Sequence, residues 1–289
     1  MSLTNFGLLC SKTTLPVCPL YQPDVIAGCY ARNGDLGTVL IFQPALGMVY
    51  LGALLMASIM LYNIKQKYTA VGRREISWFM YVYILTIILE ALLMHGFFTS
   101  QSIAYKIICA LYIGNVLGLF GVLFYNGLVP LQLIEDGTTK SMGILWGVYA
   151  GCLAVGAVVG FITFNGDGTI TFLIMNAIPL LLLVLYSCIQ VYVVLTRLDN
   201  KWPLGALSFG LLFFVMGIGF LFTSDLVCTS ASHYLDGLFF SAMAMLLAVM
   251  MLYKYWDSIT KEDLEFSVGG NTQWSSNFKS EKLLGDSYE

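Results

Sequence analysis

An apolar segment at residues 38–64 constrains the fold of this chain more than any other feature. About 20 apolar residues suffice for a helix to cross a hydrocarbon core of roughly 30 Å, and this segment is longer than that. A basic loop, KQKYTAVGRRE at residues 65–75, follows it directly. The pattern predicts a membrane span that ends at a charged loop.

The composition indicates that most of the chain lies in a bilayer. Of its 289 residues, 58% are hydrophobic and 11% are charged, whereas soluble domains average about 25% charged residues. Apolar stretches of span length recur along the chain, with short polar stretches between them. We expect Pro179 to kink the fifth span, because its ring removes one backbone donor. The seven predicted spans are residues 38–64, 76–98, 103–134, 142–164, 169–196, 204–223 and 235–256.

The distribution of Lys and Arg predicts the orientation of the spans. With seven spans, eleven of these residues fall on the side of the basic loop and three fall on the opposite side. Such an excess marks the cytoplasmic side of a membrane protein. We therefore expect an all-α, seven-transmembrane helical bundle with a luminal amino terminus and a cytoplasmic carboxyl terminus.

Three regions follow from this topology. We expect residues 1–37 to form a luminal N-terminal cap, residues 38–256 the seven-span bundle, and residues 257–289 a disordered cytoplasmic tail. The first 30 residues lack the basic start and apolar core of a cleavable signal peptide, so the first span is expected to direct the chain to the membrane. The charge pattern does not resemble a basic nucleic-acid footprint, and no nucleic-acid partner is expected.

Four of the seven cysteines fall on the predicted luminal side, which is the oxidising side. They are Cys10, Cys18, Cys29 and Cys228. Four cysteines allow three pairings. A disulfide between a cysteine of the cap and Cys228 would tie the cap to the loop before the last span. We expect at least one disulfide, and the alternative is that all four are free thiols.

Glu90 is the ionisable residue that the topology places well inside a span. Charged groups at that depth are costly and are functional candidates by default. Two interpretations remain open. Glu90 would be the proton or substrate site of a small-molecule transporter or receptor, or its carboxylate would cap polar groups of a neighbouring helix.

His95 and His233 are the two histidines of the chain, and both are predicted to lie near the luminal face. A zinc site between them, as in a metal-dependent intramembrane hydrolase, is a third possibility. However, no HxxxH or HExxH spacing places two imidazoles on one helix face, and the sequence lacks a nucleophile elbow. These absences favour a protein that is not an enzyme and that needs no metal or other cofactor.

Small residues recur at four-residue spacing in the third and fourth spans. Such GxxxG patterns let helix backbones approach closely. They would pack the bundle itself or contact a partner. The pairs are Gly114 and Gly118, Gly147 and Gly151, and Gly156 and Gly160.

Four stretches of the chain carry a family resemblance. They are FGLLCSKTTLPVCPLY at residues 6–21, CYARNGDLGTVLIFQP at 29–44, LYNIKQKYTAVGRRE at 61–75 and EDGTTKSM at 135–142. Together they resemble the fungal chitin synthase export chaperone family, and the order of the motifs, the length and the seven-span layout fit as well. The basic loop and EDGTTK are the most specific of these motifs.

The resemblance implies a multi-pass protein of the endoplasmic reticulum membrane that binds newly made chitin synthase and promotes its folding and export, in support of cell-wall chitin synthesis. It implies no catalytic residues. We expect contacts with the synthase, or with export-coat machinery, at the basic loop and at EDGTTK; otherwise these motifs only set orientation and cap a helix. The candidate contact residues are Lys65, Lys67, Tyr68, Arg73, Arg74, Glu135, Asp136, Gly137, Thr138, Thr139 and Lys140.

Overall fold

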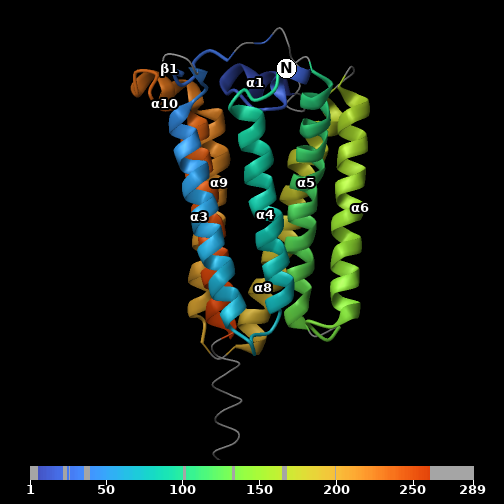
Figure 1. The fold of residues 1–289 in the computed structure, drawn as a ribbon. Helices are drawn as coiled ribbons and strands as arrows, with labels where there is room; N and C mark the ends of the chain where they lie inside the picture. Colours follow the sequence, from blue (N-terminus) through green and yellow to red (C-terminus); the bar gives the residue numbers. More distant parts are fainter. Residues whose placement is uncertain are drawn as a thin grey trace, which may run out of the picture.

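Seven long helices make up most of the computed structural model (Figure 1). The structure describes residues 6–21, 25, 27–35, 40–99, 102–131, 134–164, 168–198 and 200–260. Within these residues, seven helices are long and apolar enough to cross a membrane, so the prediction of seven apolar helices is confirmed. Most of the predicted tail, residues 261–289, lies outside the described residues.

The spans follow one another along the chain and carry the labels of Figure 1. The first four are α3 (Pro44–Gln66), α4 (Arg73–Met94), α5 (Ile103–Leu128) with its 3-10 extension η1 (Val129–Leu131), and α6 (Thr139–Thr163). The fifth comprises α7 (Thr169–Phe172), the π-helical segment η2 (Leu173–Ala177) and α8 (Ile178–Arg197). The sixth is α9 (Trp202–Phe222), and the seventh is the helix Gly237–Thr260.

Short elements gather at one end of the bundle, which we call the cap end. They are α1 (Phe6–Lys12), α2 (Cys18–Tyr21), the antiparallel strands β1 (Gly34–Asp35) and β2 (Leu40–Ile41), and α10 (Ser224–Ser230). Figure 1 shows α1, β1 and α10 together at this end. The opposite end, which we call the basic end, holds the α3–α4 loop at residues 67–72 and the turn at residues 134–138.

Two features differ from the expectation based on sequence, and a third adds detail at the predicted kink. The first span begins at Pro44 and not at residue 38, because residues 40–41 form strand β2 and proline suits the first turn of a helix. Residues 224–230, predicted to belong to a loop, form α10. Where Pro179 is expected to kink the fifth span, the chain forms the π-helical segment η2, a known way to accommodate a missing backbone donor.

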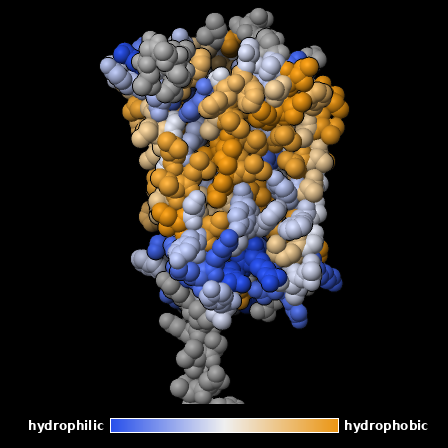
Figure 2. Space-filling model, in the orientation of Figure 1, coloured by the Kyte–Doolittle hydropathy of each residue, from blue (hydrophilic) through white to orange (hydrophobic). Residues whose placement is uncertain are grey.

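The face of the bundle in Figure 2 carries a broad apolar area over its middle and hydrophilic residues at the basic end. Large apolar side chains stay exposed on the helices, among them Leu55 at 66%, Ile162 at 71% and Val215 at 64%. Soluble monomers rarely expose apolar patches of such extent to water, whereas lipid tails are as apolar as these side chains. The surface therefore supports a multi-pass membrane protein.

Helix α5 packs closely against α6 through glycines. A Cβ atom on Gly114 would clash with the backbone of Leu153 in α6, and Gly156 faces Gly114 in turn. Gly147 and Gly151, by contrast, have open space where a Cβ atom would lie. The predicted GxxxG pairs therefore divide into two kinds, because those at the α5–α6 contact pack the bundle and the pair 147/151 faces away from it.

Buried hydrogen bonds join neighbouring spans. The fully buried Asn115 of α5 donates from its amide nitrogen to Thr86 Oγ1 in α4 at 2.7 Å and accepts from the Tyr149 hydroxyl of α6 at 2.8 Å. Gln190 of α8 donates to a backbone carbonyl of α5 at 3.0 Å and accepts from the Tyr255 hydroxyl of the seventh span at 2.6 Å. Bonds of this kind between membrane helices contribute about 0.6–2 kcal/mol each. They join α5 directly to α4, α6 and α8, and through Gln190 indirectly to the seventh span.

Gly114→Ala is expected to destabilise the bundle, because the added methyl group meets α6 backbone, which cannot rotate away as a side chain would. Overpacking of this kind typically costs about 1–3 kcal/mol. The thermal unfolding midpoint of the detergent-solubilised protein measures the effect. Gly151→Ala is the matched control on open surface, and equal stability of the two variants would contradict the close packing of α5 on α6.

Candidate functional site

The basic loop and the EDGTTK turn, distant in sequence, meet at the basic end. The backbone N–H of Gly72 donates to Asp136 Oδ2 at 2.9 Å, and Arg74 Nη1 donates to the carbonyl oxygen of Gly137 at 2.9 Å. Gly72 and Gly137 have φ angles of 67° and 65°, which glycine adopts without strain. The two predicted contact segments therefore form one structural unit.

Glu75 lies at the centre of this unit, although it is not among the contact residues predicted from the sequence. Its side chain is fully buried. Glu75 Oε1 accepts from the backbone N–H of Gly137 at 2.8 Å and from the Ser141 hydroxyl at 2.7 Å, while Oε2 has no hydrogen-bond partner among the described residues. The available sequence signal is its place in the first turn of α4, where the helix dipole favours an acidic group. One carboxylate thus holds the turn and the start of α6 against α4.

The seventh span is tied to the same unit. Lys67 forms an ion pair with Asp257, and the indole N–H of Trp256 donates to the carbonyl oxygen of Val71 at 3.1 Å. The helix continues to Thr260, past the predicted end of the span at residue 256. Lys67 is therefore engaged inside the protein.

The candidate contact residues differ in how available they are to a partner. Those bonded within the protein are Lys67, Arg74, Asp136, Gly137 and Thr138, the last of which caps α6 by accepting from the Ser141 N–H at 3.2 Å. Arg73 is half-buried, with its guanidinium 5.4 Å from the centroid of the Tyr68 ring. The exposed candidates whose side chains form no hydrogen bond or ion pair among the described residues are Lys65, Tyr68, Glu135, Thr139 and Lys140, of which Tyr68 is 82% exposed.

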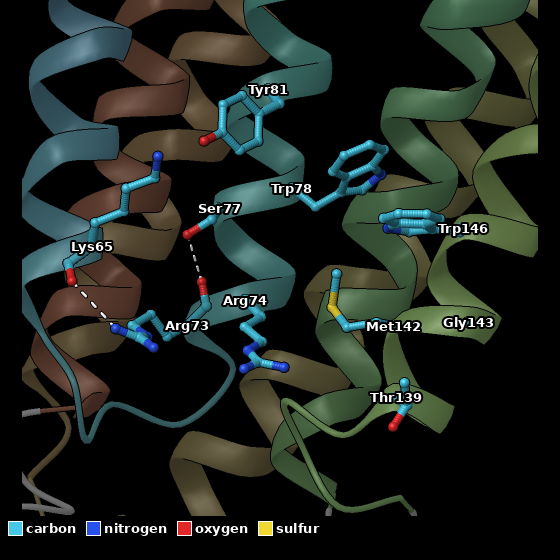
Figure 3. A pocket seen from close by; sticks show the side chains of 10 residues that line it. All are labelled: Lys65, Arg73, Arg74, Ser77, Trp78, Tyr81, Thr139, Met142, Gly143 and Trp146. Atoms are coloured by element: carbon cyan, nitrogen blue, oxygen red, sulfur yellow. Dashed lines mark hydrogen bonds between the residues drawn. The ribbon is translucent and has the colours of Figure 1, made fainter.

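A groove of about 620 Å³ lies beside this unit, between α3, α4 and α6 (Figure 3). The indole rings of Trp78 and Trp146 stack in it with their centroids 5.3 Å apart. The indole N–H of Trp78 is buried without a hydrogen-bond partner among the described residues. The lining residues are Lys65, Arg73, Arg74, Ser77, Trp78, Tyr81, Thr139, Met142, Gly143 and Trp146.

The three cations of the groove form no ion pair with an acidic residue in the part of the chain that the structure describes. Lys65 Nζ lies 5.2 Å from the centroid of the Tyr81 ring, a cation–π contact. Arg73 Nη1 donates to the carbonyl oxygen of Lys65 at 3.3 Å (Figure 3). The groove thus combines unpaired positive charge with aromatic faces, and this chemistry suits the binding of an acidic segment that also has apolar side chains.

At the cap end, the four cysteines of the predicted luminal side form two disulfides, Cys10–Cys18 and Cys29–Cys228. The second disulfide joins the segment before the first span to α10, which precedes the last span. Burial raises the pKa of Asp236, which stands just before the seventh span and accepts from the N–H of Phe239 at 3.1 Å. The cap end is therefore cross-linked, while the basic end is held by hydrogen bonds and an ion pair.

The histidine and glutamate candidates have separate surroundings. His95 follows α4, with its ring 5.9 Å from the Tyr50 ring, and burial lowers its pKa. His233 lies beside Cys29 and Cys228 in a cluster of potential metal ligands, but a disulfide offers no thiolate to a metal. His95 is not part of that cluster, so among the described residues the histidines do not combine into the zinc site considered from the sequence. Glu90 lines a cavity inside the bundle.

Comparison with known proteins agrees with the motifs. A family model described as chitin synthase export chaperone matches residues 2–270. Proteins with the same description are 38% identical over 93% of this chain and 86% of their own length in Aspergillus oryzae, 40% over 92% and 76% in Cryptococcus neoformans, and 38% over 99% and 90% in Phaeosphaeria nodorum. No solved structure matches the chain.

Glu75→Ala is expected to loosen the basic end, because it leaves the Gly137 N–H and the Ser141 hydroxyl without their acceptor. Loss of a buried hydrogen-bond partner costs about 1–3 kcal/mol, and Glu75→Gln, which keeps an oxygen, should lose less. The thermal midpoint and the rate of proteolysis at residues 134–138 report the change. Glu135→Ala, at an exposed acid, is the control; if it proved as disruptive as Glu75→Ala, the central role of Glu75 would be wrong.

Proposed function

The chain belongs to the chitin synthase export chaperone family, and from that membership we propose that it binds newly made chitin synthase in the membrane and promotes its folding and export. The observation that carries this function is the family match over residues 2–270, and relatives that align over most of their own length support it. The family is one of chaperones, so the protein is not an enzyme. The match supports the chaperone over the transporter or receptor considered for Glu90.

The location and the orientation are further parts of the proposal. We assign the protein to the endoplasmic reticulum membrane, with the cap end luminal, the basic end cytoplasmic, and cell-wall chitin synthesis as the process served. The excess of Lys and Arg at the basic end supports this orientation. The two disulfides at the cap end support it independently, since such bonds persist in oxidising compartments. The division into a cap at residues 1–37, a bundle and a cytoplasmic tail belongs to the same proposal.

We place the cytoplasmic contact with chitin synthase on the groove between α3, α4 and α6. Arg and Trp, which line it, are the residue types that most often dominate the energetics of protein interfaces. The partner that fits best is an acidic segment at the end of a membrane span of the synthase. Tyr68, Glu135 and Lys140 are exposed outside the groove and remain available to export-coat machinery.

A membrane chaperone of this kind needs surfaces and no chemistry. Helices in hydrocarbon associate through van der Waals fit and interhelical hydrogen bonds, because lipid tails compete equally for apolar faces. The cations that line the groove, Lys65, Arg73 and Arg74, can hydrogen-bond a partner without a large apolar gain. Binding of this type has modest affinity, so the client can leave once its own helices have packed.

Combining Arg73→Glu with Trp146→Ala is expected to weaken the contact with chitin synthase. Truncation of an interface hot spot costs about 2 kcal/mol or more, so co-purification of the synthase should fall by at least about tenfold, and a fluorescently tagged synthase should stay in the endoplasmic reticulum. The variant is expressed in cells that lack the native protein, and its own level is measured in parallel.

The matched control for that variant is Lys201→Glu with Trp202→Ala. It reverses one charge and truncates one indole at exposed positions near the basic end that do not line the groove. Normal export with the groove variant would remove the groove from the proposal. Normal export in cells without any copy of the protein would overturn the function itself.

The orientation is tested by glycosylation mapping. An Asn-x-Ser acceptor inserted beside Ser232, after α10, is expected to be glycosylated, because only luminal sites meet the transferase. The same acceptor inserted within residues 67–72 should stay unmodified. Gel mobility with and without endoglycosidase reports on both variants, and modification of the second acceptor alone would mean that the bundle is inverted.

A further inference from the structure

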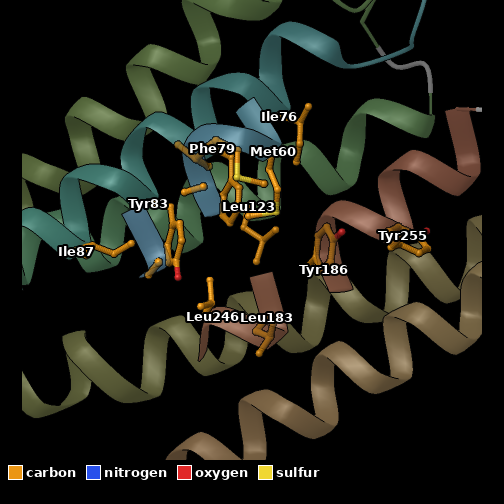
Figure 4. Packing of buried hydrophobic residues seen from close by; sticks show 14 of the residues in the cluster. Met60, Ile76, Phe79, Tyr83, Ile87, Leu123, Leu183, Tyr186, Leu246 and Tyr255 are labelled. Carbon is orange, nitrogen blue, oxygen red and sulfur yellow. The ribbon is translucent and has the colours of Figure 1, made fainter. Parts of the chain in front are cut away.

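A cavity of about 440 Å³ lies inside the bundle, bordered by α3, α4, α5, α8, α9 and the seventh span. Its walls are mainly apolar and aromatic. Phe79, Tyr83, Leu123, Leu183 and Tyr186 line it and are among the residues drawn in Figure 4. Its volume is in the range of sites that bind small molecules, about 300–1,000 Å³. It is separate from the groove at the basic end, since the two share none of their described lining residues.

The cap contributes to this cavity at the cap end. Pro16 and Val17 line it, and the Tyr105 hydroxyl of α5 donates to the carbonyl oxygen of Pro16 at 2.6 Å. The Cys10–Cys18 disulfide closes the chain segment that contains both lining residues. The covering segment is therefore held in place by a covalent bond and by a hydrogen bond to the bundle.

The Tyr50 hydroxyl and the Glu90 carboxylate form a polar pair inside this apolar cavity. Tyr50 is only 5% exposed, and its hydroxyl makes no hydrogen bond of 3.5 Å or less to a described residue. The Glu90 carboxylate is its polar neighbour and also interacts electrostatically with Tyr83 and Tyr112, and within the described residues it belongs to no ion pair. A buried hydroxyl or carboxylate without good hydrogen bonds is costly, by about 1–3 kcal/mol for the hydroxyl and by more for the carboxylate. A bound molecule that formed good hydrogen bonds to both groups would reduce this cost.

We propose that the cavity binds one apolar membrane molecule that ends in a hydroxyl group, of the sterol class. A hydroxyl can donate to the Glu90 carboxylate and accept from the Tyr50 hydroxyl at the same time. The aromatic walls offer flat faces to a fused-ring body. A phospholipid head is excluded by its charge, because Glu90 repels a phosphate and none of the described residues that line the cavity is Lys or Arg. The site would link the packing of the chaperone to the composition of its membrane, beyond its action on chitin synthase.

The test uses the purified full chain in detergent and a photoreactive, alkyne-tagged cholesterol. Labelling is expected to saturate and to map to peptides of α3, α4 or α5 that line the cavity, with unlabelled cholesterol competing. Tyr50→Phe removes one hydrogen bond and should weaken apparent affinity by about 3- to 10-fold. Ala242→Phe fills the cavity and should abolish saturable labelling.

Two matched controls change residues outside the cavity: Tyr62→Phe at a tyrosine that is 64% exposed, and Ala150→Phe at an exposed alanine of α6. Both should label like the wild type. If Ala242→Phe fails to fold, Tyr50→Phe and the mapped peptides still decide. The proposal would be overturned if phosphatidylcholine competed as strongly as cholesterol. It would also be overturned if Tyr50→Phe labelled like the wild type and the labelled peptides mapped to the outer surface. Competition by oleylamine, a cationic lipid, without competition by cholesterol would overturn it as well. None of these results depends on chitin synthase.

Discussion

Helices in hydrocarbon gain little by burying apolar side chains against each other, because the lipid is equally apolar. This bundle must therefore be held by close backbone approach and by polar contacts. Gly114 and Gly156 supply the first at the α5–α6 contact, and Asn115 and Gln190 supply the second between spans. At the basic end, the buried Glu75 adds to the bonds between the α3–α4 loop and the turn at residues 134–138 by holding that turn and the start of α6 against α4. The architecture follows from satisfying polar groups internally.

The two ends of the bundle are held together by different kinds of interaction. At the cap end, disulfides and buried hydrogen bonds fix short elements over the helices. The basic end is held by weaker, reversible contacts around Glu75 and Lys67, and beside them lies a groove with unpaired cations. The cap end is thus fixed by covalent bonds, whereas the end that carries the proposed client groove is held by hydrogen bonds and an ion pair alone.

Hydropathy and charge bias were sufficient to predict the seven apolar helices, since their length and composition depend on the bilayer alone. They could not predict that the first span begins at Pro44, because the apolar residues before it suit a strand equally well. The sequence did not predict the structural role of Glu75, because that role depends on Gly137 and Ser141, which are more than sixty positions away in the chain. Sequence spacing reveals neighbours on one helix, whereas partners on different helices emerge only from packing.

The Cys29–Cys228 bond spans 199 residues and turns most of the polypeptide into a closed ring. In the part of the chain that the structure describes, one span follows Cys228 and six precede it, so the ring cannot close until those six spans have been synthesised. A chain cut short before that point retains an unpaired Cys29 thiol. In an oxidising compartment such a thiol is open to exchange with resident oxidoreductases. The covalent seam thus records whether translation of this chaperone has passed its sixth span, and copies that stop earlier remain chemically distinguishable from longer ones.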